Sequence, residues 1–593
     1  MYRPHSPPTE GELRYGVDEN PPSGLSWMLA AQTVTLIIAG IVLTPAIVLR
    51  AAGLPASLED GVIFFALLVC GITTMVQARR VWHFGAGYIL LMGTSGAFIA
   101  VAITALQLGG MKLLMTLIVI SSLIEFLLAH KLVLLRRIIT PLVGGTTIML
   151  LAVTVMPYAF MQFQPLAEGE ASFQAPLVAF VSLATILGFS FFGSPKLRLW
   201  APVIGIIAGT VLSAYFGDLD LARVREARWI GVPELTVPGL DLSFGPHFWA
   251  LLPAFVIVTV VGAIETFGDA IAIQHMSNRD EVPVDFRTVQ GALNADGLGN
   301  LLSGLLGTLP NTTYSTSISV VDLTGVAARK VGLFCGVLIL VLAFFPKVSA
   351  AILSIPAPVV GAYILVLILL LFMHGIRMVA RDGLSYEKGF IVGMGFWLGM
   401  GFQHKAIFAD RIPDWLAPIL GNGMTSGTMV TLILVALLGL RRSHRKSVET
   451  HLTEAAMPQV EELIGHAWSK NRNWPKSAVE KLQLAGKEVL LALLEMRDQA
   501  SEAPTDKLHM EIVTSGETVE LSVGVAPLHH DITDLIDASQ SGKPMGMSKL
   551  PFQILGELVE DLQHYRYFGL DYISMTIRCD DSDSPGDQET KKV

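Results

Sequence analysis

Leu309-Pro-Asn-Thr-Thr-Tyr-Ser-Thr-Ser-Ile-Ser-Val-Val-Asp-Leu-Thr-Gly325 places a run of polar residues inside apolar sequence of the kind that lies in a membrane. Two segments with acids precede it. These are Ala263-Ile-Glu-Thr-Phe-Gly-Asp269, which continues the uncharged apolar run 248–264, and Leu293-Asn-Ala-Asp-Gly297. Ionisable side chains are costly inside a bilayer, so an acid kept there indicates a functional site. The sequence therefore predicts a membrane protein whose working residues lie between 263 and 325.

The composition is that of a protein surrounded largely by lipid. Of 593 residues, 52% are hydrophobic and only 15% are charged, whereas soluble domains carry roughly 25% charged residues. The net charge of −9 indicates no particular partner, because residues 441–593 carry much of the acid. Cys70, Cys335 and Cys579 are too far apart for a metal-ligand spacing or a disulfide framework. We expect no cofactor, no metal site and no nucleic-acid partner.

Fourteen stretches have lengths suited to membrane-spanning helices, which need about 20 apolar residues. They lie at 25–49, 60–77, 84–101, 112–130, 138–160, 175–193, 199–215, 247–272, 288–308, 313–327, 331–350, 357–379, 388–404 and 416–440. Short loops on one side carry 14 basic residues and those on the other side carry 8, so both termini are expected in the cytoplasm. The predicted fold is an all-α polytopic protein of the plasma or inner membrane.

Composition also divides the chain into five segments. We predict a disordered cytoplasmic tail (1–24), a transmembrane transporter domain (25–440), a basic linker (441–455), a cytoplasmic α/β domain (456–580) and a disordered end (581–593). Within the α/β domain, 478–496 has helical spacing, 508–513 and 518–525 form a hairpin pattern, 550–565 is an amphipathic segment expected to be the second helix, and 570–577 is a final strand.

Proline-glycine motifs repeat at nearly one offset. Pro141-Leu-Val-Gly144 and Pro358-Val-Val-Gly361 are 217 residues apart, and Pro202-Val-Ile-Gly205 and Pro418-Ile-Leu-Gly421 are 216 apart. This offset predicts two copies of a seven-span unit, and because seven is odd the copies have opposite orientations. Inverted repeats are typical of transporters that bind substrate at the midplane between broken helices. A chance recurrence of the motif in apolar sequence is the alternative.

The same offset relates spans three and ten. Gly93-Thr-Ser-Gly96-Ala-Phe98 and the run 310–319 are both rich in Gly, Ser and Thr. Such sequence is a poor helix former, and it is tolerated at membrane depth where unwound backbone lines a polar cavity. Unwound segments expose N–H and C=O groups, which can hydrogen-bond a flat polar ligand.

The acids of span eight are the first candidates for function. Glu265 and Asp269 are four residues apart and share one helix face. We predict that Glu265 binds substrate and that both carboxyl groups carry the coupled proton. A structural carboxyl, satisfied by hydroxyl groups of a neighbouring span, is the alternative for Glu265.

Other polar residues in the spans have less certain roles. Asp296 and Ser317 are predicted to hold helices together, with a direct role in function as the alternative for Asp296. Asp322 either has a functional or structural polar role or pairs with Arg329 or Lys330. Gln32, in the first span, is a candidate for bonding substrate or a neighbouring helix.

These residues resemble the nucleobase–ascorbate transporter family, also called nucleobase:cation symporter type 2, which includes uracil, xanthine and uric acid permeases. The motifs that carry the resemblance are Glu265-Thr-Phe-Gly-Asp269, Ala295-Asp-Gly297, Pro310-Asn-Thr-Thr-Tyr314, Thr324-Gly325, Pro141-Leu-Val-Gly-Gly-Thr146 and Ser354-Ile-Pro-Ala-Pro-Val-Val-Gly361. The resemblance implies core and gate subdomains, a homodimer, and symport of a nucleobase with a proton, sodium being the less favoured ion.

The resemblance also implies roles for single residues. Glu265 matches the glutamate that hydrogen-bonds the base, and Asp269 matches the proton-linked position beside it. Ser315 and Thr316 match positions of span ten that meet the base. Ser95, Gly96 and Ala97 match the span-three strand opposite.

Two departures from the family pattern concern the substrate. Thr316 stands where a Gln or Glu normally binds the base edge, and Gly96 stands where many relatives have a stacking Phe. Phe98 or Tyr314 is expected to replace that ring. The sequence thus predicts import of a xanthine-, urate- or uracil-like base without naming it.

Two other classes of function compete with nucleobase import. An anion exchanger on the same scaffold would need a basic residue in the site, and spans three, eight and ten hold no Lys or Arg before Arg329. A membrane sensor would need a signalling tail. The tail faintly resembles the histidine-kinase-like ATPase fold, with Gly546-Met547 before a helix, but Ala492 stands where an Asn should follow Glu488. Its ATP site is expected to be inactive, which favours a regulatory or dimerising role.

Overall fold

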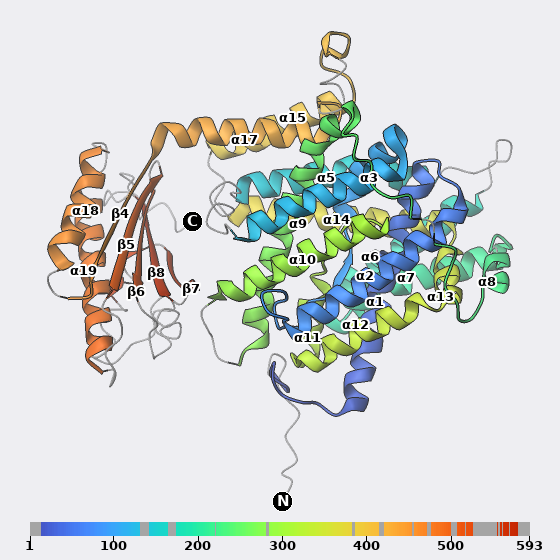
Figure 1. Ribbon diagram of the computed structural model, residues 1–593, viewed down its shortest axis with the longest axis horizontal. Coiled ribbons are helices and arrows are strands. Elements are labelled where there is room, and N and C mark those ends of the chain that lie inside the picture. Colours follow the sequence, from blue (N-terminus) through green and yellow to red (C-terminus); the bar gives the residue numbers. More distant parts are fainter. Residues whose placement is uncertain are drawn as a thin grey trace, which may run out of the picture. The chain divides into compact units, whose positions relative to one another are not determined.

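Two compact units make up the chain in the computed structural model (Figure 1), and neither is continuous in sequence. The first comprises Met1–Arg279 and Thr288–Leu434, and the second comprises Asp280–Arg287 and Val435–Val593. The structure describes residues 13–130, 141–163, 173–219, 221–235, 237–279, 284–381, 386–413, 420–453, 456–470, 476–499, 507–515, 518–525, 554–555, 558–559, 561–567 and 570–578.

Helices build nearly all of the first unit. Their bounds are α1 (Ser23–Ala51), α2 (Glu59–Arg79), α3 (Ile99–His130), α5 (Pro141–Met161), α6 (Gln174–Phe192), α7 (Pro195–Phe216), α8 (Ala222–Glu226), α9 (Pro246–Ser277), α10 (Phe286–Leu306), α11 (Thr316–Thr324), α12 (Arg329–Ala343), α13 (Pro346–Leu353), α14 (Ala357–Arg381), α15 (Tyr386–Gln403) and α17 (Gly423–Arg442). Among the described residues, eight helices are long and apolar enough to cross a membrane. The pair α12 and α13, bent by 85°, makes a ninth candidate. The count of fourteen spans stays a prediction.

Spans three and ten are interrupted as predicted. Strand β1 (Met92–Thr94) pairs antiparallel with β3 (Asn311–Thr313), and Gly93 lies opposite Thr312. A short helix follows each strand: η2 (Gly96–Phe98), which leads into α3, and α11. The expected bounds of span three were wrong, because its helix begins only after β1. That helix runs into span four through a kink at Gly110, where φ is +65°.

Glycines let several helix pairs approach to backbone contact. A Cβ atom on Gly145 of α5 would lie 2.6 Å from the carbonyl oxygen of Gly375 on α14, and one on Gly375 would lie 2.7 Å from that of Gly145. Gly71 on α2 and Gly336 on α12 are related in the same way, at 2.9 and 2.8 Å. Lipid supplies no hydrophobic driving force between helices, so membrane helices associate through close van der Waals packing, which small residues permit. Such reciprocal contacts fix which helices pack together around the interrupted spans.

The first unit also includes residues 13–24 of the N-terminal tail, which corrects the prediction of disorder for these residues; residues 1–12 lie outside the described part of the chain. The backbone N–H groups of Arg14 and Tyr15 donate to the carbonyl of Gly325 at 2.7 and 3.1 Å, and those of Ala327 and Arg329 donate to the tail. These bonds occupy backbone groups at the link between α11 and α12. No sequence pattern indicated that the N-terminal tail would bind there.

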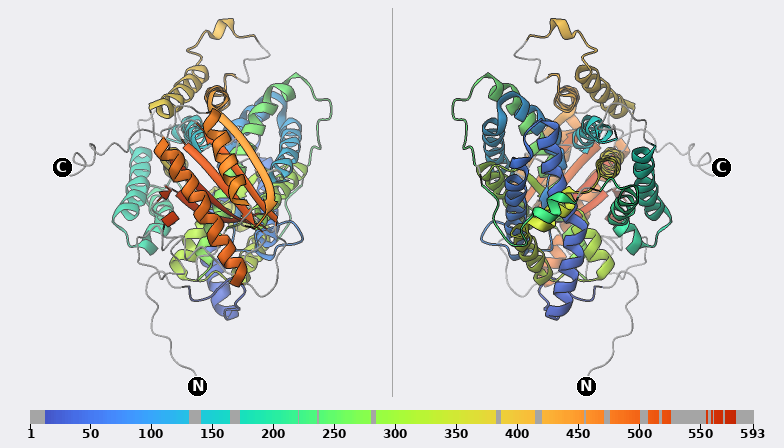
Figure 2. Two further views of the ribbon diagram at one scale, coloured as in Figure 1. Left: turned by 90° about the vertical axis from the view of Figure 1, so that its left-hand side faces the viewer. Right: turned by 90° about the vertical axis from the view of Figure 1, so that its right-hand side faces the viewer.

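A six-stranded sheet forms the second unit. The strand order is β2 (Val284–Asp285), β7 (Asp561–Tyr567), β8 (Leu570–Arg578), β6 (Thr518–Val525), β5 (Lys507–Ser515) and β4 (Ser443–His451). Only the β2–β7 pair is parallel. Helices α18 (Met457–Lys470) and α19 (Lys476–Gln499) cover one face (Figure 2), where apolar side chains of both helices pack on those of the strands.

The expected helix 478–496 and the hairpin 508–513 with 518–525 are present in this unit. Two expectations were wrong. The supposed linker 441–455 contains β4, which pairs with β5 along its whole length, and the amphipathic segment 550–565 ends inside β7. Gly546-Met547 and the end 581–593 lie outside the described residues.

Candidate functional site

Glu265 is the carboxyl group most available to a ligand. It lies on α9, which contacts β3, η2 and α11 around the strand crossing. The side chain is partly exposed, and it hydrogen-bonds no other described residue. Its charged neighbours are Asp269 and Asp296, both acids. A buried polar group is normally paired, so an unpaired carboxyl at the crossing has its hydrogen-bonding capacity free for a ligand.

Asp269, one helical turn further on, is held by the unwound segment of span ten. Its Oδ2 accepts a hydrogen bond from the Thr313 hydroxyl at 2.8 Å, and its Oδ1 accepts one from the Ser315 hydroxyl at 2.7 Å. Its side chain is 5% exposed. The structure therefore brings together Asp269 and Ser315, as the sequence indicated, and fixes β3 and the start of α11 to α9.

Three glycines of α9 and η2 have open space next to their backbone. A Cβ atom added at Gly262, Gly268 or Gly96 would meet no heavy atom within 4 Å. Gly262 and Gly268 lie three residues before and after Glu265, on the same side of α9. Gly96 begins η2, which contacts α9, and it is exposed. No neighbouring side chain therefore fills the positions next to the backbone of α9 on either side of Glu265.

The two aromatic candidates have different surroundings. Phe98 is 2% exposed and packs on Phe255 of α9 with ring centroids 6.0 Å apart, so the structure places it in the apolar core and not at an open face. Tyr314 is partly exposed; its ring lies against Gly93 and its hydroxyl donates to the carbonyl of Thr94 at 2.9 Å. Tyr314 is therefore the ring that the strand crossing positions.

The remaining candidates fall into two groups. Thr316, the first residue of α11, and Gln32 of α1 are partly exposed, whereas Ala97 is 8% exposed beside Gly96. Ser317 is buried, where its hydroxyl accepts from the Leu91 N–H at 2.9 Å and donates to the Tyr314 carbonyl at 2.7 Å. The first bond connects α11 to the residue that precedes β1, and the second is local to span ten.

Asp322 does not form either of the ion pairs considered for it. It is exposed on α11 and has no ion pair with a described residue. Arg329 instead pairs with Asp18 at 3.1 Å, and the ammonium of Lys330 donates to the carbonyl of Pro21 at 3.0 Å. Both cations therefore bind groups of the N-terminal tail, which was expected to be disordered.

Sequence reasoning missed Glu125, a buried acid on α3. It is 1% exposed, and its Oε2 accepts from the Asn300 side chain at 2.8 Å. Asp296 on α10 is its neighbour, and Asp296 Oδ2 accepts from the Thr266 hydroxyl at 2.6 Å. The signal was available, because Glu125 interrupts the apolar run of span four as Glu265 interrupts that of span eight.

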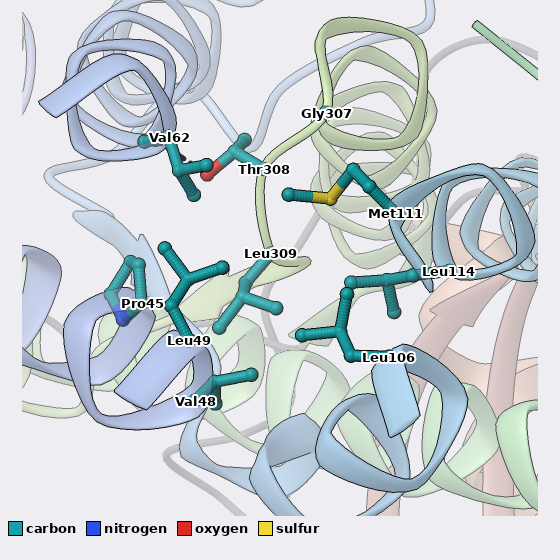
Figure 3. Close-up of a pocket in the computed structure, with 10 residues that line it drawn as sticks. All are labelled: Pro45, Val48, Leu49, Val62, Leu106, Met111, Leu114, Gly307, Thr308 and Leu309. Carbon is teal, nitrogen blue, oxygen red and sulfur yellow. Dashed lines mark hydrogen bonds between the residues drawn. The ribbon is translucent and has the colours of Figure 1, made fainter. Parts of the chain in front are cut away.

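A small apolar cavity lies next to residues 307–309, which precede β3, and Glu265 does not line it (Figure 3). Its lining residues are Pro45, Val48, Leu49, Val62, Leu106, Met111, Leu114, Gly307, Thr308 and Leu309. The Thr308 hydroxyl, its one polar side-chain group, donates to the carbonyl of Val62 at 2.9 Å. With that group satisfied, the cavity offers no bond to a polar ligand. No cluster of three or more metal-ligating side chains occurs in the described part of the chain.

Comparisons of the sequence with a family model and with individual proteins point to one family of permeases. A family model described as "Permease family" matches residues 25–408. The chain is 29% identical to xanthine permease XanP of Escherichia coli (strain K12), over 71% of this chain and 94% of that protein. It is 27% identical to uric acid permease PucK of Bacillus subtilis (strain 168), over 71% and 97%. The transmembrane domain of the cyanobacterial bicarbonate transporter BicA is 15% identical, with a TM-score of 0.46, and the match covers 71% of this chain and all of that one.

Proposed function

Because this chain belongs to the nucleobase–ascorbate transporter family of permeases, an integral membrane family of transporters, we propose that it imports a nucleobase by proton symport. The substrate is a xanthine-, urate- or uracil-like base. Transport proceeds across the plasma membrane, with both termini in the cytoplasm, in a homodimer whose subunits each contain a core and a gate subdomain.

The free carboxyl of Glu265 carries this proposal. A purine or pyrimidine base is flat, and its edge presents N–H donors next to carbonyl acceptors. One carboxyl group accepts from such donors, and the uncovered backbone at Gly262 and Gly268, on the same side of α9, leaves room for a thin ring. The relatives named for xanthine and uric acid support the same class of ligand.

Proton coupling is supported by the way Asp269 is bound. Thr313 and Ser315 both donate to its carboxylate in the arrangement described. If Asp269 takes up a proton, one of these hydroxyl groups loses its acceptor and reorients, which loosens the link between α9 and the unwound segment. Proton uptake at Asp269 would thus alter the backbone that borders the ligand space.

The test is uptake by proteoliposomes that contain the purified protein. Labelled xanthine, urate, uracil and adenine are supplied with and without an inward proton gradient. We expect one of these bases to accumulate, and only with the gradient. The same distribution of label with and without a gradient would contradict symport. No uptake of any of the four bases would contradict the proposal that the substrate is a nucleobase.

Glu265→Gln tests the role of the carboxyl group. Loss of a hydrogen bond to a charged group costs about 1.5–3 kcal/mol, so we expect uptake to fall at least about tenfold. Glu226→Gln, an exposed acid on α8 in the same unit, is the matched control and should transport at the wild-type rate. Wild-type uptake by Glu265→Gln would remove Glu265 from the mechanism.

A further inference from the structure

Glu125 of α3 and Asp296 of α10 are neighbouring buried acids. Each side chain is 1% exposed. Burial disfavours the charged form of a carboxyl group and two adjacent carboxylates repel each other, so the pair is most stable with a proton on one of the two acids. The pair therefore holds at least one proton in the arrangement described.

The other contacts of the pair show where that proton lies. Glu125 Oε2 accepts from Asn300, and Asp296 Oδ2 accepts from Thr266. Glu125 Oε1 and Asp296 Oδ1 accept from no N–H or O–H of a described residue. A proton held by the pair therefore lies on one of these two oxygens, because the other two already accept hydrogen bonds.

No positive charge offsets the pair in the described part of the molecule. Neither acid forms an ion pair with a Lys, an Arg or a His, and the other charged groups that face Asp296 are Asp269 and Glu265 of α9. A fully ionised pair would place two buried negative charges in contact without compensation, which is strongly unfavourable. Protons are thus the ions that this site can exchange at least cost.

Two hydroxyl groups connect the pair to Asp269. Thr266 Oγ1 lies 2.6 Å from Asp296 Oδ2 and 3.3 Å from Thr313 Oγ1, and either hydroxyl can be the donor of the second contact. Thr313 Oγ1 lies 2.8 Å from Asp269 Oδ2. The chain from Asp269 to Asp296 is therefore continuous, and each hydroxyl in it can accept one proton and pass on its own.

We propose that Asp296, positioned by the protonated Glu125, is a second proton-binding site that exchanges protons with Asp269 through Thr313 and Thr266. The proton leaves Asp269 Oδ2 for Thr313, whose hydroxyl proton passes to Thr266, whose own proton passes to Asp296 Oδ2. Asp269 becomes an anion and Asp296 becomes neutral, so both hydroxyl groups are unchanged and charge is conserved. The inference rests on the proposed proton symport.

Thr266→Val removes the central hydroxyl of this path and leaves both acids in place. Two quantities are measured in proteoliposomes: accumulation driven by an inward proton gradient, and exchange of labelled for unlabelled base at equal pH on both sides. We expect accumulation to fall at least tenfold and exchange to stay within about twofold of wild type. Thr308→Val, which removes a buried hydroxyl that only caps the Val62 carbonyl, should change neither.

Two further variants keep the inference falsifiable if Thr266→Val does not fold. Asp296→Asn retains hydrogen-bonding atoms toward Thr266 and Glu125 but carries no proton, so it should lose accumulation and keep exchange. Glu125→Gln still donates to Asp296 and should keep accumulation within about threefold.

Several results would overturn the inference. These are wild-type accumulation by Thr266→Val or Asp296→Asn, an equal loss of accumulation and exchange in both, or accumulation driven by a sodium gradient instead of protons. Wild-type protein that accumulates no base would remove the proposed function itself, a result distinct from failure of the relay alone.

Discussion

Gly93 and Gly96 lie three residues apart in span three, yet their surroundings are opposite. A Cβ atom at Gly93 would overlap the ring of Tyr314, whereas one at Gly96 would meet nothing within 4 Å. We therefore expect Gly93→Ala to separate β1 from β3 and to destabilise the protein by about 1–3 kcal/mol, the usual cost of overpacking. A lower melting temperature of the purified protein in detergent would show it.

Gly96→Ala is the matched substitution. It should leave the melting temperature unchanged and raise the KM for the transported base, because the new methyl group enters the space beside Glu265. Equal effects of the two substitutions on stability would contradict the packing described. An unchanged KM for Gly96→Ala would place the ligand elsewhere.

The role and surroundings of a single residue could be predicted when its partners are close to it in sequence, and not when they are distant. Glu265 and Asp269 follow from one rule, that acids are costly in apolar sequence, and their spacing places them on one face of α9. Glu125 obeys the same rule but matches no family motif, so it was overlooked. The surroundings of Phe98 could not be predicted, because its partner Phe255 lies more than 150 residues away along the chain.

At the scale of elements, the N-terminal strap, defined as residues 13–21, forms backbone bonds with the link between α11 and α12. Besides the bonds to Gly325, the N–H of Ala327 donates to Tyr15 at 2.9 Å and that of Arg329 donates to Val17 at 3.0 Å. Removal of residues 2–21 leaves the carbonyl of Gly325 and the N–H groups of Ala327 and Arg329 either bonded to water or unpaired. We expect the melting temperature to fall by several degrees, whereas removal of residues 2–12 should leave it unchanged.

The ion pair of the strap should matter much less than its backbone. The Gly16 N–H and the Arg279 guanidinium hold the pKa of Glu19 below its usual value. The contribution of Glu19 to stability is therefore present above its usual pKa and is lost as the pH falls through the lowered pKa. Exposed ion pairs contribute little, so Glu19→Gln should barely change the melting temperature at neutral pH and not at all in acid. A loss equal to that of the whole strap would contradict this order.

Elements with a strong local pattern were predictable, and those that depend on distant pairing were not. The interrupted spans three and ten followed from their Gly, Ser and Thr content, and the β5–β6 hairpin followed from its alternation. Strand β4 was mistaken for a linker because it lies at the edge of the sheet and its charged residues lack the apolar pattern of a buried strand. The segment 550–565 was misjudged because a short amphipathic run fits either a helix or a strand.

At the scale of the whole molecule, the two units share the chain between α9 and α10. Val284 and Asp285 pair with Tyr565 and Arg566 of β7, so a segment between two helices of the transport unit belongs to the sheet of the other unit. No sequence pattern indicates a two-residue strand of this kind. The second unit is therefore joined through the chain both to α9, which carries Glu265, and to α10, which carries Asp296.

Removal of residues 443–593 takes away β7 and leaves β2 without a partner. Glu265, Asp269 and Ser315 all lie in the first unit, so the KM for the transported base should stay within about twofold of wild type. Alternating access requires the elements that carry the site to move. Without β7 the segment between α9 and α10 no longer pairs in a sheet, so we expect the maximal uptake rate to rise. Removal of residues 581–593 alone, which leaves every described strand in place, is the control. An unchanged maximal rate in the longer truncation would show that β2 does not restrain transport, and a changed KM would show that the second unit acts on the substrate site instead.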